Sequence, residues 1–154
     1  MNLEKITRIR ESFLENNEKV GKLEYTSGNY DEEGVLIEKD IPTITTEFCE
    51  IGIYSNIIYF TFVINSNSYN EKLIDSLKNF SNFKIYGFKN FLEDYNLKDL
   101  ENEIKKDKYF QVNFNYSIDE KVEFLLKQYQ EIKKNMLKSK IEIINQLEID
   151  LTKE

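Results

Sequence analysis

The chain has 154 residues, a net charge of −7 and a sequence pI near 4.9. That length is enough for one domain with a buried core, and the acidity disfavours nonspecific binding to nucleic-acid phosphates or anionic membranes. The lack of histidine removes the commonest general base and metal ligand, and a single cysteine excludes an internal disulfide or a multi-cysteine metal site.

The N-terminus and the residue usage indicate where the protein is located and what kind of genome encodes it. The first residues, MNLEKITRIRE, alternate charged and apolar positions, unlike a signal peptide, and no run approaches the ~20 apolar residues of a membrane span. We therefore expect a soluble, cytoplasmic protein. Lys, Asn, Ile, Tyr and Phe are plentiful and alanine is absent. Their AT-rich codons suggest an AT-rich bacterial genome, or a phage or mobile element within one.

The first elements are predicted from hydrophobic spacing and turn residues. Apolar residues at near-helical intervals predict a helix over residues 2–20, capped by Asn2. Two short strands are predicted at 22–26 and 34–39, joined by the acidic loop SGNYDEEG. Pro42 is expected in the connection that follows.

Residues 47–65 predict a β-hairpin. If Ser55-Asn56 is a two-residue turn, with Asn56 left-handed, then Tyr54 pairs with Ile57 and pairing continues outward. One face of the hairpin is then wholly apolar and belongs to the core; it collects Cys49, Ile51, Ile53, Ile58, Phe60 and Phe62. The opposite face is aromatic and semi-polar; it collects Phe48, Glu50, Gly52, Tyr54, Ile57, Tyr59, Thr61 and Val63.

The remaining elements follow from two capping boxes and one clean alternation. A box opening at Ser68 predicts a helix over 68–80, then a strand at 82–88 and a helical region at 89–106. Alternation predicts a strand at 109–116. A box opening at Ser117, with no Gly or Pro after it, predicts a helix over 118–149, roughly 45 Å long. Such a helix would overhang the sheet and leave an apolar stripe for association, formed by Leu137, Ile141, Ile144 and Leu147.

This order favours a single α+β domain, with a mainly antiparallel sheet of about 4–6 strands, helices on one face and a long C-terminal helix. The order also resembles that of small acidic secretion chaperones, which alternate a helix, three strands, a helix, two strands and a helix. The resemblance concerns element order alone, so no functional residue is carried across. It implies a chaperone-like dimer as one alternative function.

The candidates for chemistry all have simpler interpretations. Residues 31–40 are acidic but lack calcium-loop spacing, and acidic-x-Lys patterns at Glu103 and Asp119 fall on predicted helices rather than at a strand end. Cys49 lies on the core face, where nothing helps its thiol to ionise. Phosphate-cradling glycine motifs are missing. No catalytic residue, cofactor or metal is therefore predicted.

The last strand extends the semi-polar face of the hairpin. We call this surface the second face; it comprises Tyr54, Ile57, Tyr59, Thr61, Val63, Gln111, Asn113 and Asn115. Large aromatic residues mixed with uncharged polar groups are typical of the centre of a protein interface. Stacking of bases on Tyr54, Tyr59 and Tyr86 is disfavoured because Lys84 is the one basic residue placed beside them. Cover by the chain itself, by another protein or by a small ligand remains open.

We expect a non-catalytic protein-binding protein: a small acidic inhibitor or antagonist, of a phage or mobile-element anti-defence or immunity type, that occludes a surface of a larger protein. The expected contact residues are Tyr54, Ile57, Tyr59, Thr61, Gln111, Asn113, Ile141 and Ile144. A homodimer through the C-terminal helix is one alternative. Another is a small ligand- or metal-binding domain or enzyme with a pocket of carboxylates, among them Glu50 or the 31–40 loop. No membrane contact is expected, and nucleic acid only through a partner complex.

Overall fold

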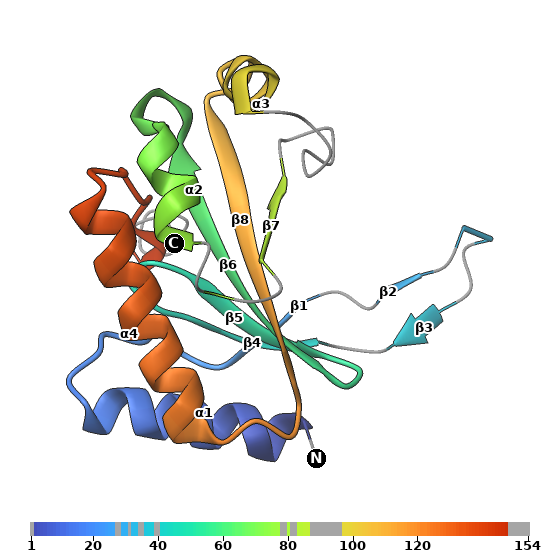
Figure 1. Cartoon of the computed structure of the whole chain (residues 1–154). Coiled ribbons are helices and arrows are strands. Elements are labelled where there is room, and N and C mark those ends of the chain that lie inside the picture. The colour runs from blue at the N-terminus through green and yellow to red at the C-terminus, as the bar shows by residue number, and fades with distance from the viewer. Residues whose placement is uncertain are drawn as a thin grey trace.

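The computed structural model describes residues 2–26, 29–30, 32–33, 36–38, 41–77, 80, 83–86 and 97–147. Its centre is a six-stranded antiparallel sheet. In spatial order the strands are β1 (Glu24–Thr26), β4 (Ile41–Thr45), β5 (Glu50–Tyr54), β6 (Ile57–Asn65), β8 (Tyr109–Ser117) and β7 (Phe83–Tyr86). Two further strands, β2 (Asn29–Tyr30) and β3 (Leu36–Glu38), pair with each other and project away from the sheet (Figure 1).

Three helices cover one face of the sheet: α1 (Asn2–Glu15), α2 (Glu71–Leu77) and α4 (Val122–Lys138) (Figure 1). Helix α1 contacts β4, β5 and α4, and α2 contacts α4. Helix α3 (Leu97–Ile104) lies at the end of the sheet where β8 begins. The predicted α+β class, with an antiparallel sheet and helices on one face, is confirmed. The core lies between the helices and the apolar side of the strands, and its largest members include Phe13, Phe60, Phe62, Phe110, Phe114 and Tyr129.

The register of the central hairpin is the predicted one. Tyr54 pairs with Ile57, Ile53 with Ile58, and Ile51 with Phe60. Both residues of the Ile53–Ile58 and Ile51–Phe60 pairs are fully buried, because that face of the hairpin lies under the helices. The turn differs in one detail: Ser55, with φ 53°, is the left-handed residue rather than Asn56.

The outer end of the hairpin departs from the prediction. The β5–β6 ladder ends at the Glu50–Thr61 pair, so Cys49 does not pair with Phe62. The cause is a local turn, in which the Thr46 hydroxyl accepts a hydrogen bond from the Cys49 N–H at 2.9 Å. The Thr46 N–H also donates to the Cys49 carbonyl, at 2.7 Å. Cys49 nevertheless remains fully buried, as predicted.

The first helix ends earlier than the predicted residue 20. Asn17 takes a left-handed conformation, with φ 66°, and the Glu18 N–H donates to the Phe13 carbonyl at 3.0 Å. This backward bond is the usual closure of a helix by a left-handed residue. Val20 then forms a bridge with Thr46. The chain is thereby delivered to the sheet edge rather than to another helical turn.

Pro42 also lies elsewhere than predicted. It is the second residue of β4 and pairs with Tyr25 of β1. The ladder between β4 and β5 begins only at Thr43, one residue later. Proline is tolerated there because its missing N–H falls where that ladder has no partner residue. Of the predicted strand 34–39, residues 36–38 form β3 and the others lie outside the described residues.

Helix α2 is shorter than the predicted helix over 68–80. Its cap is Asn70, whose Oδ1 accepts from the Lys72 N–H at 3.0 Å. Ser68 instead ends a short 3-10 turn, Ser66–Ser68, where its hydroxyl donates to the Asn65 carbonyl. Residues 78–79 lie outside the described part. So do 82, 87–88 and 89–96, which belong to the predicted strand 82–88 and helical region 89–106.

The predicted helix over 118–149 is wrong at both ends. Ser117 accepts from the Asp119 N–H in a separate turn, and α4 begins only at Val122. The helix stops at Lys138, after 17 residues, or about 25 Å. Lys140 is left-handed, with φ 61°, and turns the chain back toward the sheet. The overhang predicted for Leu137, Ile141, Ile144 and Leu147 therefore does not exist. Residues 142–144 instead run beside β6, and residues 146–147 are helical again. We call residues 141–147 the strap.

Candidate binding surface

The register assembles the second face from neighbouring strands. Across β6 and β8, Tyr59 pairs with Asn115, Thr61 with Asn113 and Val63 with Gln111. In β6 and β8 these residues alternate with fully or nearly fully buried ones, and they are all partly exposed. At the hairpin end, Ile57 is 42% exposed. No described helix lies on this side, since α1, α2 and α4 occupy the other (Figure 1).

Most of the predicted contact residues therefore share one surface. Tyr54, Ile57, Tyr59, Thr61, Gln111 and Asn113 come together on the second face through β5, β6 and β8. The two others do not join them. Ile141 and Ile144 lie on the strap, where Ile141 is 3% exposed and the Ile144 N–H donates to the Val63 carbonyl. The roles of all eight residues in binding remain predictions.

Tyr59 is the best-defined side chain of the second face. Its ring lies over Gly52, because a Cβ on that glycine would come within 2.6 Å of Tyr59 Cε1 and closer still to Cζ and Oη. Burial raises the pKa of Tyr59 well above its usual range, and the charge of Glu50 and a hydrogen bond to it raise the pKa further. Tyr59 is therefore a neutral hydrogen-bond donor to Glu50, and not an ionisable catalyst.

The middle of the second face is polar but uncharged. One row of paired residues crosses the sheet from Thr45 through Glu50, Thr61 and Asn113 to Lys84. Glu50 and Lys84 flank the neutral pair Thr61 and Asn113, and Thr45 lies beyond Glu50. The Oδ1 atom of Asn113 is buried and finds no hydrogen-bond partner among the described residues. A buried acceptor without a partner costs about 1–3 kcal/mol.

Cys49 is not a candidate nucleophile in this structure. Its side chain is fully buried, and burial raises the pKa of the thiol far above its usual range, although a hydrogen bond from Thr46 acts in the opposite direction. The Thr46 hydroxyl lies 3.5 Å from Sγ. A thiol held neutral in this way is structural.

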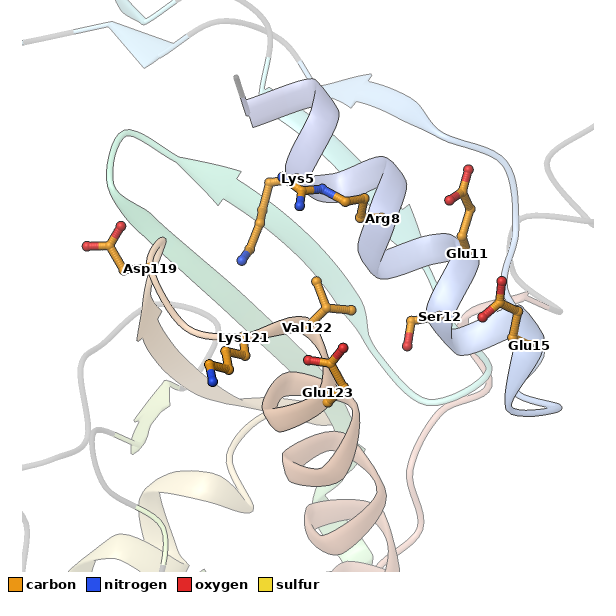
Figure 2. Close-up of a pocket in the computed structure, with 9 residues that line it drawn as sticks. All are labelled: Lys5, Arg8, Glu11, Ser12, Glu15, Asp119, Lys121, Val122 and Glu123. Carbon is orange, nitrogen blue, oxygen red and sulfur yellow. The ribbon is translucent and has the colours of Figure 1, made fainter.

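A hollow of about 410 Å³ lies between α1 and the start of α4. Figure 2 shows Lys5 extending from α1 toward the segment before α4, where its ammonium donates to the Glu120 carbonyl. The lining mixes both signs of charge: Lys5, Arg8, Glu11, Ser12, Glu15, Asp119, Lys121, Val122 and Glu123. The ligand-binding alternative predicts a carboxylate pocket with Glu50 or residues 31–40. Glu50 does not line this hollow, and neither do those residues of 31–40 that the structure describes.

Within the described residues, no three His, Cys, Asp or Glu side chains come together in a group able to hold a metal ion. None of the described helices combines the length and the apolar character needed to cross a bilayer.

Comparison with known proteins identifies the fold and nothing more. No family model matches the sequence, and no curated protein matches it. The chain is similar in structure to a conserved hypothetical protein from Pyrococcus furiosus, with a TM-score of 0.71 and 18% sequence identity. The match covers 90% of this chain and 92% of that one. At this identity the similarity concerns the arrangement of helices and strands, and the name of the archaeal protein assigns no activity.

Proposed function

We propose that the chain is a non-catalytic protein-binding protein that uses the second face to cover a surface of a larger protein. The observation that carries this proposal is the asymmetry of the sheet. One face lies under three helices, whereas the other presents Tyr54, Ile57, Tyr59 and Val63 with no described helix across it. Apolar and aromatic side chains left on one sheet face favour a partner that buries them.

The chemistry of the second face suits a protein partner better than nucleic acid or a membrane. Protein interfaces are enriched in tyrosine and depleted in charge at their centres, with polar groups at the rim. In the row from Thr45 to Lys84 the central pair, Thr61 and Asn113, is uncharged, and one residue of each charge, Glu50 and Lys84, lies directly beside it. The partner segment over this face would supply an apolar group beside Ile57, which is 42% exposed.

The expected mode of action is occlusion. A chain with net charge −7 approaches basic surfaces faster than acidic ones, so the partner is expected to carry positive charge around the docking site. Binding there would prevent the partner from using the covered surface, as a small antagonist does. An inhibitor encoded by a phage or mobile element is our specific version of this proposal, and it rests on the AT-rich residue usage.

The test compares two matched charge insertions. Ile57 lies on the second face at 42% exposure, and Leu3 lies on α1 at 45% exposure. Ile57→Asp and Leu3→Asp therefore place the same carboxylate at equally exposed apolar positions on different surfaces. Tagged wild type and both variants are used to capture partners from a nuclease-treated bacterial lysate, with and without phage infection. Circular dichroism confirms that the variants fold.

The expected result is one near-stoichiometric protein captured by wild type and Leu3→Asp and lost with Ile57→Asp. Tyrosine labelling of the purified complex should then show protection of Tyr54 and Tyr59. Equal capture by all three proteins would place the partner elsewhere and overturn the proposal. Light scattering tests whether the occupant is instead a second copy of the chain. If wild type is a dimer and Ile57→Asp is a monomer, the second face binds another copy of the chain.

A further inference from the structure

The strap supplies a short strand to the edge of β6 at a point where β5 has already ended. Ile143 forms an antiparallel bridge with Ile64. The Asn65 N–H donates to the Glu142 carbonyl at 2.9 Å, and the Ile144 N–H donates to the Val63 carbonyl at 2.8 Å. Because β8 pairs with the other edge of β6 along its whole length, the strap occupies the side that β5 would have taken. The same chain thus fills its own strand-addition site.

Side chains of the strap fill the space beside this edge. Ile141 and Ile143 are 3% and 9% exposed, and the intervening Glu142 points to solvent. Further along, the Gln146 N–H donates to the Glu47 carbonyl at 3.0 Å, and the Leu147 side chain lies against Gly21. The part of the strap beside β6 therefore pairs as a strand. It carries two buried β-branched apolar residues, Ile141 and Ile143, two positions apart.

Three features make the strap a poor ligand for this site. It is joined to α4 through Lys140, whose left-handed backbone is unfavourable for a residue with a side chain. The buried Nε2 of Gln146 finds no partner among the described residues. The joint also borders a hollow of about 530 Å³, so Ser139 and Lys140 are not packed on that side. Two further hydrogen bonds oppose release: the Asn70 side-chain amide donates to the Ser139 carbonyl at 3.0 Å, and the Glu142 N–H donates to the Ser68 hydroxyl at 2.9 Å.

We propose that the edge of β6 at residues 63–65 is a docking site for an extended segment of a partner protein, which displaces the strap and pairs antiparallel with β6. The segment carries two β-branched apolar residues at alternate positions, as Ile141 and Ile143 do. Main-chain hydrogen bonds to Val63 and Asn65 would supply affinity, and the buried sites that Ile141 and Ile143 now fill would supply selectivity. This site uses the edge of β6 rather than the side chains of the second face, so the two proposals stand independently.

Hydrogen exchange on the full chain tests whether the strap opens. The matched pair of amides is Asn65, which donates to the strap, and its neighbour Ser66, which donates to the Lys108 carbonyl, both at 2.9 Å. Opening of the strap alone exposes the first amide and not the second. We expect protection factors at Asn65, Ile144 and Gln146 to be at least 10-fold lower than at Ser66. Equal protection at all four would make the strap an integral strand and overturn the proposal.

A labelled peptide with the sequence of residues 140–147, KIEIINQL, tests whether the edge accepts a segment in trans. Ile143→Asp in the full chain weakens its own strap by placing a carboxylate opposite Ile64. Fluorescence anisotropy should show that the peptide binds this variant at least 10-fold more tightly than it binds wild type. A control peptide, in which aspartate replaces the isoleucine of position 143, should not bind. Equal binding of the two peptides, or binding of neither, argues against the site. Should Ile143→Asp not fold, the exchange experiment on wild type still decides.

Discussion

The aromatic ring of Tyr59 on β6 lies across the backbone of Gly52, the residue with which it pairs on β5. The glycine leaves the space that the ring occupies, and the ring in turn covers a strand position that has no side chain of its own. The tyrosine hydroxyl reaches Glu50 from this position. Gly52 therefore determines how the most prominent aromatic side chain of the second face is held.

Gly52→Ala should destabilise the protein by about 1–3 kcal/mol, the usual cost of overpacking. The new methyl group would overlap the Tyr59 ring and push it off the sheet. Urea denaturation of the variant measures the loss. In a Tyr59→Ala background the same substitution should be neutral or stabilising, because alanine is favoured over glycine within a strand. An equal loss in both backgrounds would show that the ring is not the cause.

The hairpin could be predicted from sequence because its evidence is local. In β6 buried residues alternate with exposed or partly exposed ones, and in β5 the apolar Ile51 and Ile53 are buried on either side of Gly52. A register shift of one residue would have exposed Ile51 and Phe60. The same reasoning assembled six of the eight predicted contact residues on one surface. Gly52 was placed on that surface too, but the contact with Tyr59 depends on the side-chain rotamer, which strand spacing does not specify.

The strap could not be predicted because its sequence fits two structures. Leu137, Ile141 and Ile144 have helical spacing, while Ile141 and Ile143 have strand spacing, and neither glycine nor proline separates them from α4. Two interactions decide the outcome: the left-handed turn at Lys140 and the backbone pairing with β6. The second is a tertiary interaction across some 80 residues. Similarly, Asn70 rather than Ser68 caps α2, because Ser68 already bonds the end of β6.

Lys140→Gly should stabilise the protein by about 0.5–1 kcal/mol. Glycine adopts the left-handed conformation without the steric cost that lysine incurs. The matched control is Lys138→Gly, which places glycine in the last turn of α4 and should cost about 1 kcal/mol. Thermal and urea unfolding of both variants provide the comparison. Destabilisation by both substitutions would mean that the lysine side chain at position 140 contributes more than its backbone costs.

Stability should decline in alkaline solution. Burial raises the pKa values of Cys49, Tyr59, Tyr116 and Tyr129 above their usual ranges. In the unfolded chain the same groups ionise near about 8.5 for cysteine and about 10 for tyrosine. Above those values the unfolded chain binds fewer protons than the folded one, so the free energy of unfolding falls as pH rises, whereas it is insensitive to these groups below about pH 8.

Urea titrations at about pH 7, 9 and 10.5 test this dependence, with a slope of about 1.4 kcal/mol per pH unit for each group that is fully shifted. Cys49→Ala is the informative variant. This substitution should lower the free energy of unfolding at all pH values, because it removes buried volume. It should also abolish the part of the alkaline decline in stability that begins at about pH 8.5. A decline that begins at the same pH in both proteins would assign it to other groups.

Lys133 and Glu18 should be strongly coupled. The ammonium lies 3.0 Å from Glu18 Oε2, both side chains are largely buried, and the rings of Tyr129 and Phe48 lie 5.1 and 5.4 Å from Nζ. Lys133→Met should cost about 1–3 kcal/mol, since it leaves a carboxylate with one remaining donor, Gln130.

A double-mutant cycle isolates this pair. Glu18→Gln in the Lys133→Met background should recover part of the loss, and the coupling energy should exceed about 0.5 kcal/mol. Strictly additive losses in urea denaturation would instead assign the effect of Lys133→Met to the contacts between the lysine stem and the rings.

The packing of α1 against α4 has a consequence for synthesis. Ile6, Ile9 and Phe13 are fully buried, and Phe13 meets Tyr129 with ring centroids 5.0 Å apart. Translation at about 5–20 residues per second leaves on the order of ten seconds between these two residues. During that interval β4 and β5 can cover part of the apolar stripe of the first helix, but the part that meets α4 stays uncovered and becomes a site for chaperones or premature association. Completion of the fold is thereby delayed until the last helix has been made.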